Sequence, residues 1–313
     1  DNACVTNSTH DEIVVVEGPP VITAINGIED GCVGLTINPE VEYEECYSDI
    51  NIYDWTFEQG NPNGSNNEVP GPVNYLNPGT FDIKIEATNG CGTDELTEQI
   101  VISPEIGGNT ITCPLDPICQ GDIPDEIIDG TEPPTLTGGD GIYAYSWEMC
   151  DDATCTNPVP VAGAMDPDLD YGMPLNQTTW FRRIVTSGGC ESISDPPCVI
   201  TVIPGIEGND IGENQSLCKN EIPNDLLGQG NLTGGSGNYS YLWKESDDIN
   251  APDPWPDASG LNTDPDYIFP GELEQTMYYK RIVNSIPPDE CDSESNIVTI
   301  TFYERPSITS PDE

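Results

Sequence analysis

Cysteine is the residue type in this chain whose number and spacing predict the most chemistry. The 313 residues include 12 cysteines and a single histidine. No two cysteines stand in the CxxC spacing that tetrahedral zinc sites commonly use. We therefore expect disulfides and an extracellular or cell-surface protein, because disulfides persist outside the reducing cytosol.

Catalytic chemistry lacks the residues that it needs. The one histidine, His10, stands on an expected end strand, so no Ser-His-Asp or Cys-His arrangement is available. No Gly-rich phosphate loop followed by Lys occurs. Acidic pairs such as Glu44-Glu45 are numerous, but chance produces them among 56 Asp and Glu residues. The sequence therefore predicts a protein that is not an enzyme.

Two Asp-rich segments carry oxygen ligands of the kind that Ca²⁺ prefers. The alternating carboxylates of the first segment recur in part in the second, which gives five candidate metal ligands: Asp166, Asp168, Asp170, Asp264 and Asp266. Ca²⁺ is the one cofactor that the sequence suggests. The favoured alternative is a Pro-containing loop whose Asp side chains cap turns.

Trp255 is the candidate ligand-contact residue. It stands among prolines in the expected loop 252–256, where a polysaccharide could reach its ring. Tyr143, Tyr145 and Trp147 instead alternate along an expected strand. Burial against an opposite sheet explains that alternating set.

The charge balance excludes two classes of partner. Asp and Glu number 56 against 8 Lys and Arg, which gives a formal net charge of −48. Such a polyanion repels nucleic acid and anionic lipid. No stretch is apolar enough to span a bilayer, so we expect no direct membrane insertion. A solvated acidic surface suited to salty water accounts for the charge.

Short alternating runs of β-branched and aromatic residues predict strands, for example at residues 81–85 and 298–302. No window keeps an apolar period of 3.6 residues, because Pro, Gly or Asn-Gly interrupts each one. The predicted fold class is therefore all-β.

An internal repeat organises the chain. Residues 106–204 realign on residues 206–306 at a shift near 100. Leu136-Thr137-Gly138-Gly139 returns as Leu232-Thr233-Gly234-Gly235, and the Trp147 strand returns with Trp243. A repeat of this length with a Trp on a central strand is typical of an immunoglobulin-like β-sandwich. The predicted organisation is tandem sandwiches.

The repeat also predicts the domain boundaries. We expect the last strand of a preceding domain at 1–18, sandwiches at 19–104, 105–204 and 205–305, and the start of a following domain at 306–313. The incomplete ends favour a fragment of a longer protein. The alternative is a chain whose end strands complete neighbouring copies by strand exchange.

Three motifs of the first sandwich resemble a polycystic-kidney-disease (PKD) domain: Tyr53-Asp54-Trp55-Thr56-Phe57, Pro78-Gly79-Thr80-Phe81 and Asn89-Gly90-Cys91-Gly92. Glu58-Gln59-Gly60 replaces the Gly-Asp-Gly that usually follows the first motif.

The segment 178–190 resembles the PKD-like modules of giant Bacteroidota surface proteins, among them gliding-motility adhesins that leave the cell by type IX secretion. The resemblance implies a non-catalytic adhesive or spacer role at the bacterial outer surface. It also implies neighbouring repeats as partners and a polysaccharide or protein as the adhesion target.

The repeat guides the disulfide predictions for the later sandwiches. Both later repeats keep one cysteine pair, and we predict the within-domain disulfides Cys119–Cys190 and Cys218–Cys291. Four further cysteines occur in the second sandwich and are all missing from the third. Their joint absence predicts two more pairs, Cys150–Cys155 and Cys113–Cys198.

The remaining cysteines leave alternatives open. In a sandwich the loop that enters the Trp strand and the final hairpin turn lie at the same end, which favours Cys46–Cys91. Cys32–Cys91 is the alternative. Cys4 belongs to the incomplete domain, so its partner is expected upstream, and Cys32 is otherwise unassigned.

These patterns predict a stiff, disulfide-stabilised stalk or adhesive array in a large secreted adhesin. One alternative is a glycan-binding module attached to a secreted enzyme. Another is the subunit of an extracellular filament that assembles by strand exchange.

Overall fold

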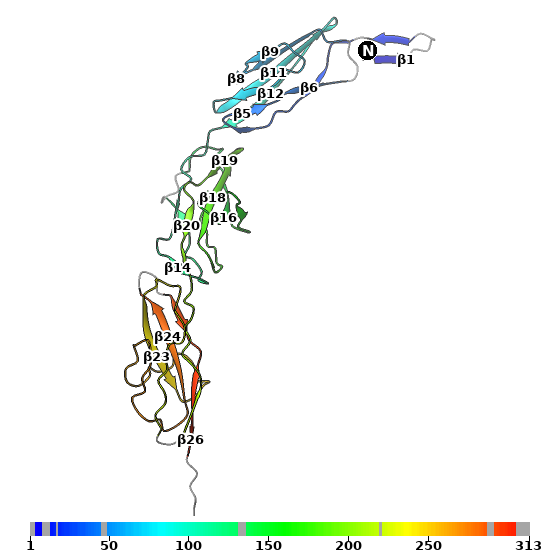
Figure 1. Cartoon of the computed structure of the whole chain (residues 1–313). Coiled ribbons are helices and arrows are strands. Elements are labelled where there is room, and N and C mark those ends of the chain that lie inside the picture. The colour runs from blue at the N-terminus through cyan, green and yellow to red at the C-terminus, as the bar shows by residue number, and fades with distance from the viewer. Residues whose placement is uncertain are drawn as a thin grey trace, which may run out of the picture.

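The computed structural model describes residues 4–7, 13–16, 18–44, 49–130, 136–218, 221–286 and 291–304. These residues form strands, turns and bridges but no helix, which confirms the predicted all-β class. Three immunoglobulin-like β-sandwiches follow one another along an extended, curved molecule (Figure 1). No helix in this part of the chain is long and apolar enough to cross a membrane.

The first sandwich has a five-stranded sheet in the order β4 (Gly31–Cys32), β12 (Gly92–Ser103), β11 (Gly79–Asn89), β7 (Ile52–Phe57) and β9 (Gly64–Ser65). Against it lie β5 (Leu35–Ile37), β10 (Val73–Tyr75) and β8 (Gly60–Asn61), with the pair β3 (Ile22–Asn26) and β6 (Glu40–Tyr43). Strand alternation turns Ile83 and Ile85 of β11 into a core that also buries Trp55. The aromatic and β-branched runs thus form strands because one face of each is buried.

The second sandwich is built on the sheet β17 (Val159–Pro160), β16 (Ala144–Cys150), β18 (Thr179–Ser187) and β19 (Cys190–Ile193), with β20 (Cys198–Ile200) also on β18. Two short pairs complete it: β13 (Ile111–Thr112) with β15 (Ile128–Asp129), and β14 (Ile118–Cys119) with β21 (Val202–Ile203). Trp147 and Phe181 are buried in its core. The expected burial of the Trp147 strand face is thereby confirmed for its tryptophan.

The third sandwich orders its sheet as β22 (Gln215–Cys218), β26 (Val298–Tyr303), β24 (Met277–Ser285) and β23 (Tyr239–Ser246), with β25 (Asp292–Glu294) also on β24. Its core buries Trp243, Tyr267 and Tyr279. Tyr267 packs its ring against both Trp243 and Tyr279 at centroid distances of 5.5 Å.

One feature recurs in all three sandwiches. A short early strand pairs in parallel with the last strand of the sandwich: β4 with β12, β14 with β21, and β22 with β26. Each early strand ends on a cysteine, which is Cys32, Cys119 or Cys218. Each of these cysteines therefore lies at the end of its sandwich from which the chain leaves.

Before the first sandwich, β1 (Cys4–Asn7) and β2 (Ile13–Val16) form an antiparallel hairpin. The interval expected to hold the last strand of a preceding domain thus contains two paired strands. His10 and residues 305–313 lie outside the described residues.

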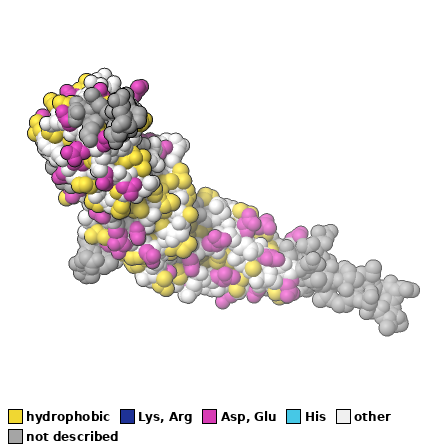
Figure 2. Space-filling view, turned by 90° about the horizontal axis from the view of Figure 1, so that it is seen from below, with side chains coloured by type: hydrophobic (Ala, Val, Ile, Leu, Met, Phe, Trp, Pro, Cys, Tyr) yellow, Lys and Arg dark blue, Asp and Glu magenta, His cyan; other side chains and the backbone are white. Residues whose placement is uncertain are grey.

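The acidic side chains are spread over the face shown in Figure 2 rather than gathered in one patch. Several of the few cations are buried inside the sandwiches: Arg183 is 0% exposed, and Lys280 and Arg281 are each 2% exposed. These three positive charges therefore balance little of the acidic exterior.

Candidate functional site at the joints between the sandwiches

Two disulfides cross from one sandwich to the next. Cys32 of the first sandwich bonds to Cys190 of the second, with 4.8 Å between their Cα atoms. Cys119 of the second sandwich bonds to Cys291 of the third, with 5.6 Å between their Cα atoms. The predicted within-domain pairs Cys119–Cys190 and Cys218–Cys291 are therefore wrong.

The correction has a simple geometric cause. Within the second sandwich, Cys119 lies opposite Ile203, where the chain leaves the domain. Cys190 lies at the β18–β19 turn, with its Sγ 3.2 Å from the carbonyl oxygen of Pro104, where the chain enters. The two repeated cysteines thus lie at opposite ends of one sandwich, and each faces a different neighbour.

The two pairs predicted from the extra cysteines of the second sandwich are confirmed. Cys150–Cys155 closes a short loop, and Cys113–Cys198 joins the two halves of the sandwich, with Cα separations of 5.1 and 5.4 Å.

The other cysteine predictions have different outcomes. The predicted Cys46–Cys91 pair includes Cys46, which lies outside the described residues. The alternative Cys32–Cys91 is wrong, because Cys32 bonds to Cys190. Cys218 is exposed and makes no disulfide with any residue in the described part of the chain.

A backbone clamp holds each linker against the sandwich that follows it. At the first joint, Gly107 N donates to Thr137 O at 2.9 Å, and Thr137 N donates to Gly107 O at 3.0 Å. Gly139 N donates to Pro104 O at 2.8 Å. The first Leu-Thr-Gly-Gly motif is therefore a linker clamp.

The second joint repeats this clamp. Glu207 and Thr233 exchange backbone hydrogen bonds of 2.9 and 3.1 Å, and Gly235 N donates to Pro204 O at 2.8 Å. The sequence marked the motif as a repeat but did not reveal its role. Spacing from the linker gives no signal either, because 32 residues separate Pro104 from Leu136 and 28 separate Pro204 from Leu232.

The clamp requires glycine at its third position. Gly138 has φ +81° and Gly234 has φ +83°, a region that L side chains rarely adopt. A Cβ at Gly138 would also overlap the carbonyl oxygen of Glu105. Tyr143 then donates its hydroxyl to Gly138 O at 2.9 Å and holds the turn from its other side.

The first joint is packed rather than open. The turn before β19 lies so close to the first sandwich that a Cβ on Gly189 would stand 2.8 Å from the Cα of Gly31. Ile106, Val185 and Cys190 form a buried cluster there, with Cys32 packed against it. Disulfide, clamp and cluster together restrict how the two sandwiches bend against each other.

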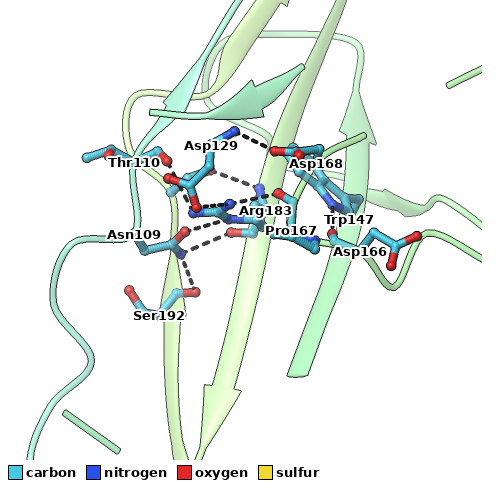
Figure 3. A network of polar contacts seen from close by, with 10 residues as sticks. Asn109, Thr110, Asp129, Trp147, Asp166, Pro167, Asp168, Arg183 and Ser192 are labelled. Atoms are coloured by element: carbon cyan, nitrogen blue, oxygen red, sulfur yellow. Dashed lines mark hydrogen bonds and ion pairs between the residues drawn. The ribbon is translucent and has the colours of Figure 1, made fainter. Parts of the chain in front are cut away.

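A buried arginine ties the exit of the linker to the centre of the second sandwich (Figure 3). Arg183 on β18 donates from Nε to Asn109 Oδ1 at 3.0 Å and from Nη1 to Asp129 Oδ2 at 3.0 Å. Its Nη1 also donates to Pro167 O at 2.7 Å, and Nη2 to Thr110 O at 3.1 Å. The ion pair with Asp129 compensates the cost of burying the guanidinium.

Asn109 completes this network. Its Nδ2 donates to Ser192 O at 2.8 Å and to Arg183 O at 3.3 Å. Asn209 makes the same two contacts in the third sandwich, to Ser293 O at 2.8 Å and to Arg281 O at 3.3 Å. The repeated Gly-Asn after each linker thus anchors the linker to the central strand.

Two of the candidate calcium ligands accept hydrogen bonds from backbone amides that are distant in sequence. Asp168 Oδ1 accepts from Asp129 N at 2.7 Å, and Asp266 Oδ1 accepts from Gly228 N at 2.9 Å. Within the described ranges, no group of three His, Cys, Asp or Glu side chains could hold a metal ion. The three carboxylates Asp166, Asp168 and Asp170 therefore form no such group, and Asp264 with Asp266 adds none. Asp168 and Asp266 instead connect their loops to backbone amides 39 and 38 residues away in sequence.

Trp255 is not an exposed contact residue, contrary to the prediction. Its side chain is 3% exposed, and its Nε1 donates to Ala251 O at 3.1 Å. The Nζ of Lys280 lies 4.7 Å from the ring centroid and pairs with Asp253 and with Glu294. The loop folds back onto β24 because the ring shields this buried ammonium from water.

The comparison with solved structures finds proteins of low sequence identity. An I-band fragment of titin is 10% identical, covers 93% of this chain and 100% of its own, and gives a TM-score of 0.36. The three N-terminal domains of the Highly Immunogenic Outer Capsid protein of bacteriophage RB49 are 12% identical, with coverages of 91% and 99% and a TM-score of 0.34. Extracellular domains 3–5 of Drosophila OTK are 8% identical, with coverages of 92% and 96% and a TM-score of 0.32. The comparison with curated proteins finds no match.

One family matches twice. The family described as a domain of unknown function (DUF8696) matches residues 118–204 in the second sandwich and residues 207–304 in the third. Because these two segments cover more than half of the chain, this protein belongs to the DUF8696 family.

Proposed function

We propose that this chain is an inextensible spacer of an extracellular protein, in which disulfides carry tension past the folded sandwiches. The observation that supports this role is the order of the three long-range disulfides along the molecule. A short stretch of chain joins Cys190 to Cys198, and another joins Cys113 to Cys119. These two stretches connect the disulfides in series: Cys32–Cys190, Cys113–Cys198 and Cys119–Cys291.

Together these disulfides form a continuous covalent path. From Cys32 the path crosses to Cys190 and follows the chain for eight residues to Cys198. It then crosses to Cys113, follows the chain for six residues to Cys119, and crosses to Cys291. The path through the polypeptide alone would instead take about 260 residues from Cys32 to Cys291.

The difference in length decides the mechanics. A fully extended chain spans about 3.6 Å per residue, so the two short stretches reach about 50 Å and the polypeptide alone about 900 Å. With the disulfides intact, unfolding of the second sandwich adds almost no length between Cys32 and Cys291. Pulling on the two ends therefore releases little additional length of chain.

The wider setting of the spacer is a cell-surface adhesin of bacterial type. The disulfides support a site outside the reducing cytosol, and the acidic surface supports a solvated stalk. The resemblance of the sequence to PKD-like surface modules supports the adhesin, gliding motility and type IX secretion included. Intact mass of the natural protein, recovered from the cell surface, tests this setting: a mass many times the 33.8 kDa of this chain is expected.

Single-molecule pulling from the two ends of the chain tests the spacer itself. For the oxidised protein we expect less than about 50 Å of chain between Cys32 and Cys291 to be released, and about 900 Å after reduction. The variant Cys113→Ser with Cys198→Ser removes the middle crossing. The next shortest path then runs from Cys119 to Cys190, and the expected length is about 250 Å.

The loop disulfide provides the matched control. Cys150→Ser with Cys155→Ser removes a disulfide that lies off the path, so the released length should stay that of the oxidised wild type. Contour length does not depend on stability, so destabilised variants still report it. Equal contour lengths before and after reduction would show that the disulfides carry no tension.

A further inference from the structure

The third sandwich contains a buried arginine whose carboxylate partner has been replaced by glycine. Arg281 on β24 occupies the same strand position as Arg183, opposite the core tryptophan. Its Nε donates to Asn209 Oδ1 at 2.9 Å and its Nη1 to Pro265 O at 2.6 Å. These two contacts match those of Arg183 in the second sandwich.

The position of Asp129 is different. Asp129 N donates to Asp168 Oδ1, and in the third sandwich Gly228 N donates to Asp266 Oδ1 in the same way. Gly228 therefore stands where the second sandwich has the aspartate that pairs with arginine. Among the residues that the structure describes, no carboxylate forms an ion pair with Arg281. No group in the described residues accepts a hydrogen bond from its Nη2.

An open hollow of about 310 Å³ lies beside this arginine and is lined by Arg281, Gly228, Asn231, Tyr239, Tyr241 and Asp266, among others. The guanidinium itself occupies the space next to Gly228, because a Cβ on that glycine would lie 2.6 Å from Nη1 of Arg281. The volume of the hollow suits one small molecule or one residue of a polymer.

The energetics favour filling this cavity with an anion. Arg281 is 2% exposed, and an arginine side chain stays charged in proteins. Burial lowers the pKa of the Arg281 guanidinium, although Tyr241, Asp266 and Asp210 oppose that effect through their charges. A buried charge without a paired counter-charge is strongly destabilising.

We propose that the hollow beside Arg281 binds the carboxylate group of a small organic acid, which supplies the counter-charge that Asp129 supplies in the second sandwich. A planar carboxylate matches the donor geometry of the guanidinium. The Asp266 carboxylate on the cavity wall disfavours dianions such as sulfate. The rings of Tyr239 and Tyr241 give the rest of the ligand an aromatic wall, which suits a sugar acid.

Side-chain NMR of the whole chain tests the site with its own internal control. The chain has four arginines, so their ¹⁵N-labelled Nε–H groups give few signals, and Arg183 reports on an arginine whose pocket is filled. Sodium acetate, sodium glucuronate, sodium sulfate and glucose are added at constant ionic strength against sodium chloride. We expect a saturating shift of the Arg281 signal with acetate and glucuronate and none at Arg183.

Two matched variants exchange the behaviour of the two sandwiches. Gly228→Asp should abolish the Arg281 shift, because the guanidinium must move to admit the new side chain and then pairs with its carboxylate. Asp129→Gly should create a carboxylate-dependent shift at Arg183. Either variant alone tests the proposal if the other fails to fold.

The outcomes separate clearly. Tighter binding of glucuronate than of acetate identifies a sugar acid, and equal binding identifies a simple carboxylate. A shift of Arg281 that chloride or sulfate reproduces, or that Arg183 shares, overturns the proposal. So does the absence of any saturating shift in the wild-type chain.

Discussion

At the scale of single residues, one strand position shows how the three sandwiches diverge. The residue opposite the core tryptophan is Ile85 in the first sandwich, Arg183 in the second and Arg281 in the third. The isoleucine packs into an apolar core, and the first arginine is neutralised by Asp129. The second arginine keeps its hydrogen bonds but not its counter-charge. Similar folds thus bury an apolar side chain, an ion pair and an unpaired cation at one site.

Tyr75 in the first sandwich presents a buried polar group of another kind. Its side chain is 0% exposed, and its hydroxyl has no hydrogen-bond partner within the described ranges. Burial, with a smaller contribution from Glu58, raises the pKa of Tyr75 from 10.0 to about 12. The folded state therefore favours the neutral phenol more than the unfolded state does.

Tyr75→Phe should separate the two consequences of this burial. At pH 7 we expect unchanged stability or a gain of about 1 kcal/mol, because an unsatisfied hydroxyl is removed. A raised pKa in the folded state gives stability that is present below pH 10 and lost as the pH rises toward 12. The advantage of the variant should therefore grow between pH 10 and pH 12, measured as the difference in urea midpoint from wild type.

A constant difference in midpoint across that pH range would contradict the assignment to Tyr75. The alkaline sensitivity that remains in the variant belongs to other groups, among them Tyr267, whose pKa burial also raises to about 12.

Residue-scale predictions from sequence failed where neighbours in space decide the role. Trp255 looked exposed because prolines surround it, yet its ring covers Lys280, which lies 25 residues away in sequence. Nothing in the local sequence reveals that partner. The burial of Trp147 was predictable, because it depends only on strand alternation.

At the scale of elements, strands and repeats were predictable and the connections between sandwiches were not. Alternating apolar residues predicted β11 and β26, because each strand buries one face. The pairing of the repeated cysteines was not predictable from the repeat. A pair within each domain and a pair between successive domains leave the same pattern in sequence, and only the end of the sandwich at which each cysteine lies distinguishes them.

The linker clamp gives an element-scale prediction. Gly138→Ala places a methyl group against the carbonyl oxygen of Glu105 and also forces alanine to a φ of +81°. We expect the clamp to open, with faster hydrogen exchange at the amides of Gly107, Thr137 and Gly139, measured by exchange mass spectrometry. The loss of stability should exceed the 1–2 kcal/mol or so that the left-handed conformation alone costs.

Gly141→Ala is the matched control for this substitution. Gly141 has φ +86°, but a Cβ there meets nothing within 4 Å. Gly141→Ala should lower the stability by the cost of the left-handed conformation alone and leave the clamp closed. Equal hydrogen exchange at the three amides in both variants would show that steric overlap at position 138 does not open the clamp.

At the scale of the whole molecule, charge acts against the compact sandwiches while the joints hold them together. The formal net charge is −48, and the chain has only 8 Lys and Arg residues, one of which, Arg183, is buried with its partner Asp129. Exposed carboxylates therefore repel one another along the length of the chain. The Debye length falls from about 30 Å at 0.01 M salt to about 10 Å at 0.1 M, so salt should reduce this repulsion strongly.

Salt and divalent ions distinguish diffuse screening from a calcium site. We expect the melting temperature to rise by several degrees between low and physiological NaCl, and to rise equally with CaCl₂ and MgCl₂ at equal concentration. The two ions screen alike, whereas a built site discriminates them by coordination number and size. Asp168 and Asp266 already accept hydrogen bonds from backbone amides, so chelation should leave the melting temperature in NaCl unchanged. A larger rise with calcium than with magnesium, removed by Asp168→Asn, would instead show that the Asp-rich loop gathers its carboxylates around a metal ion.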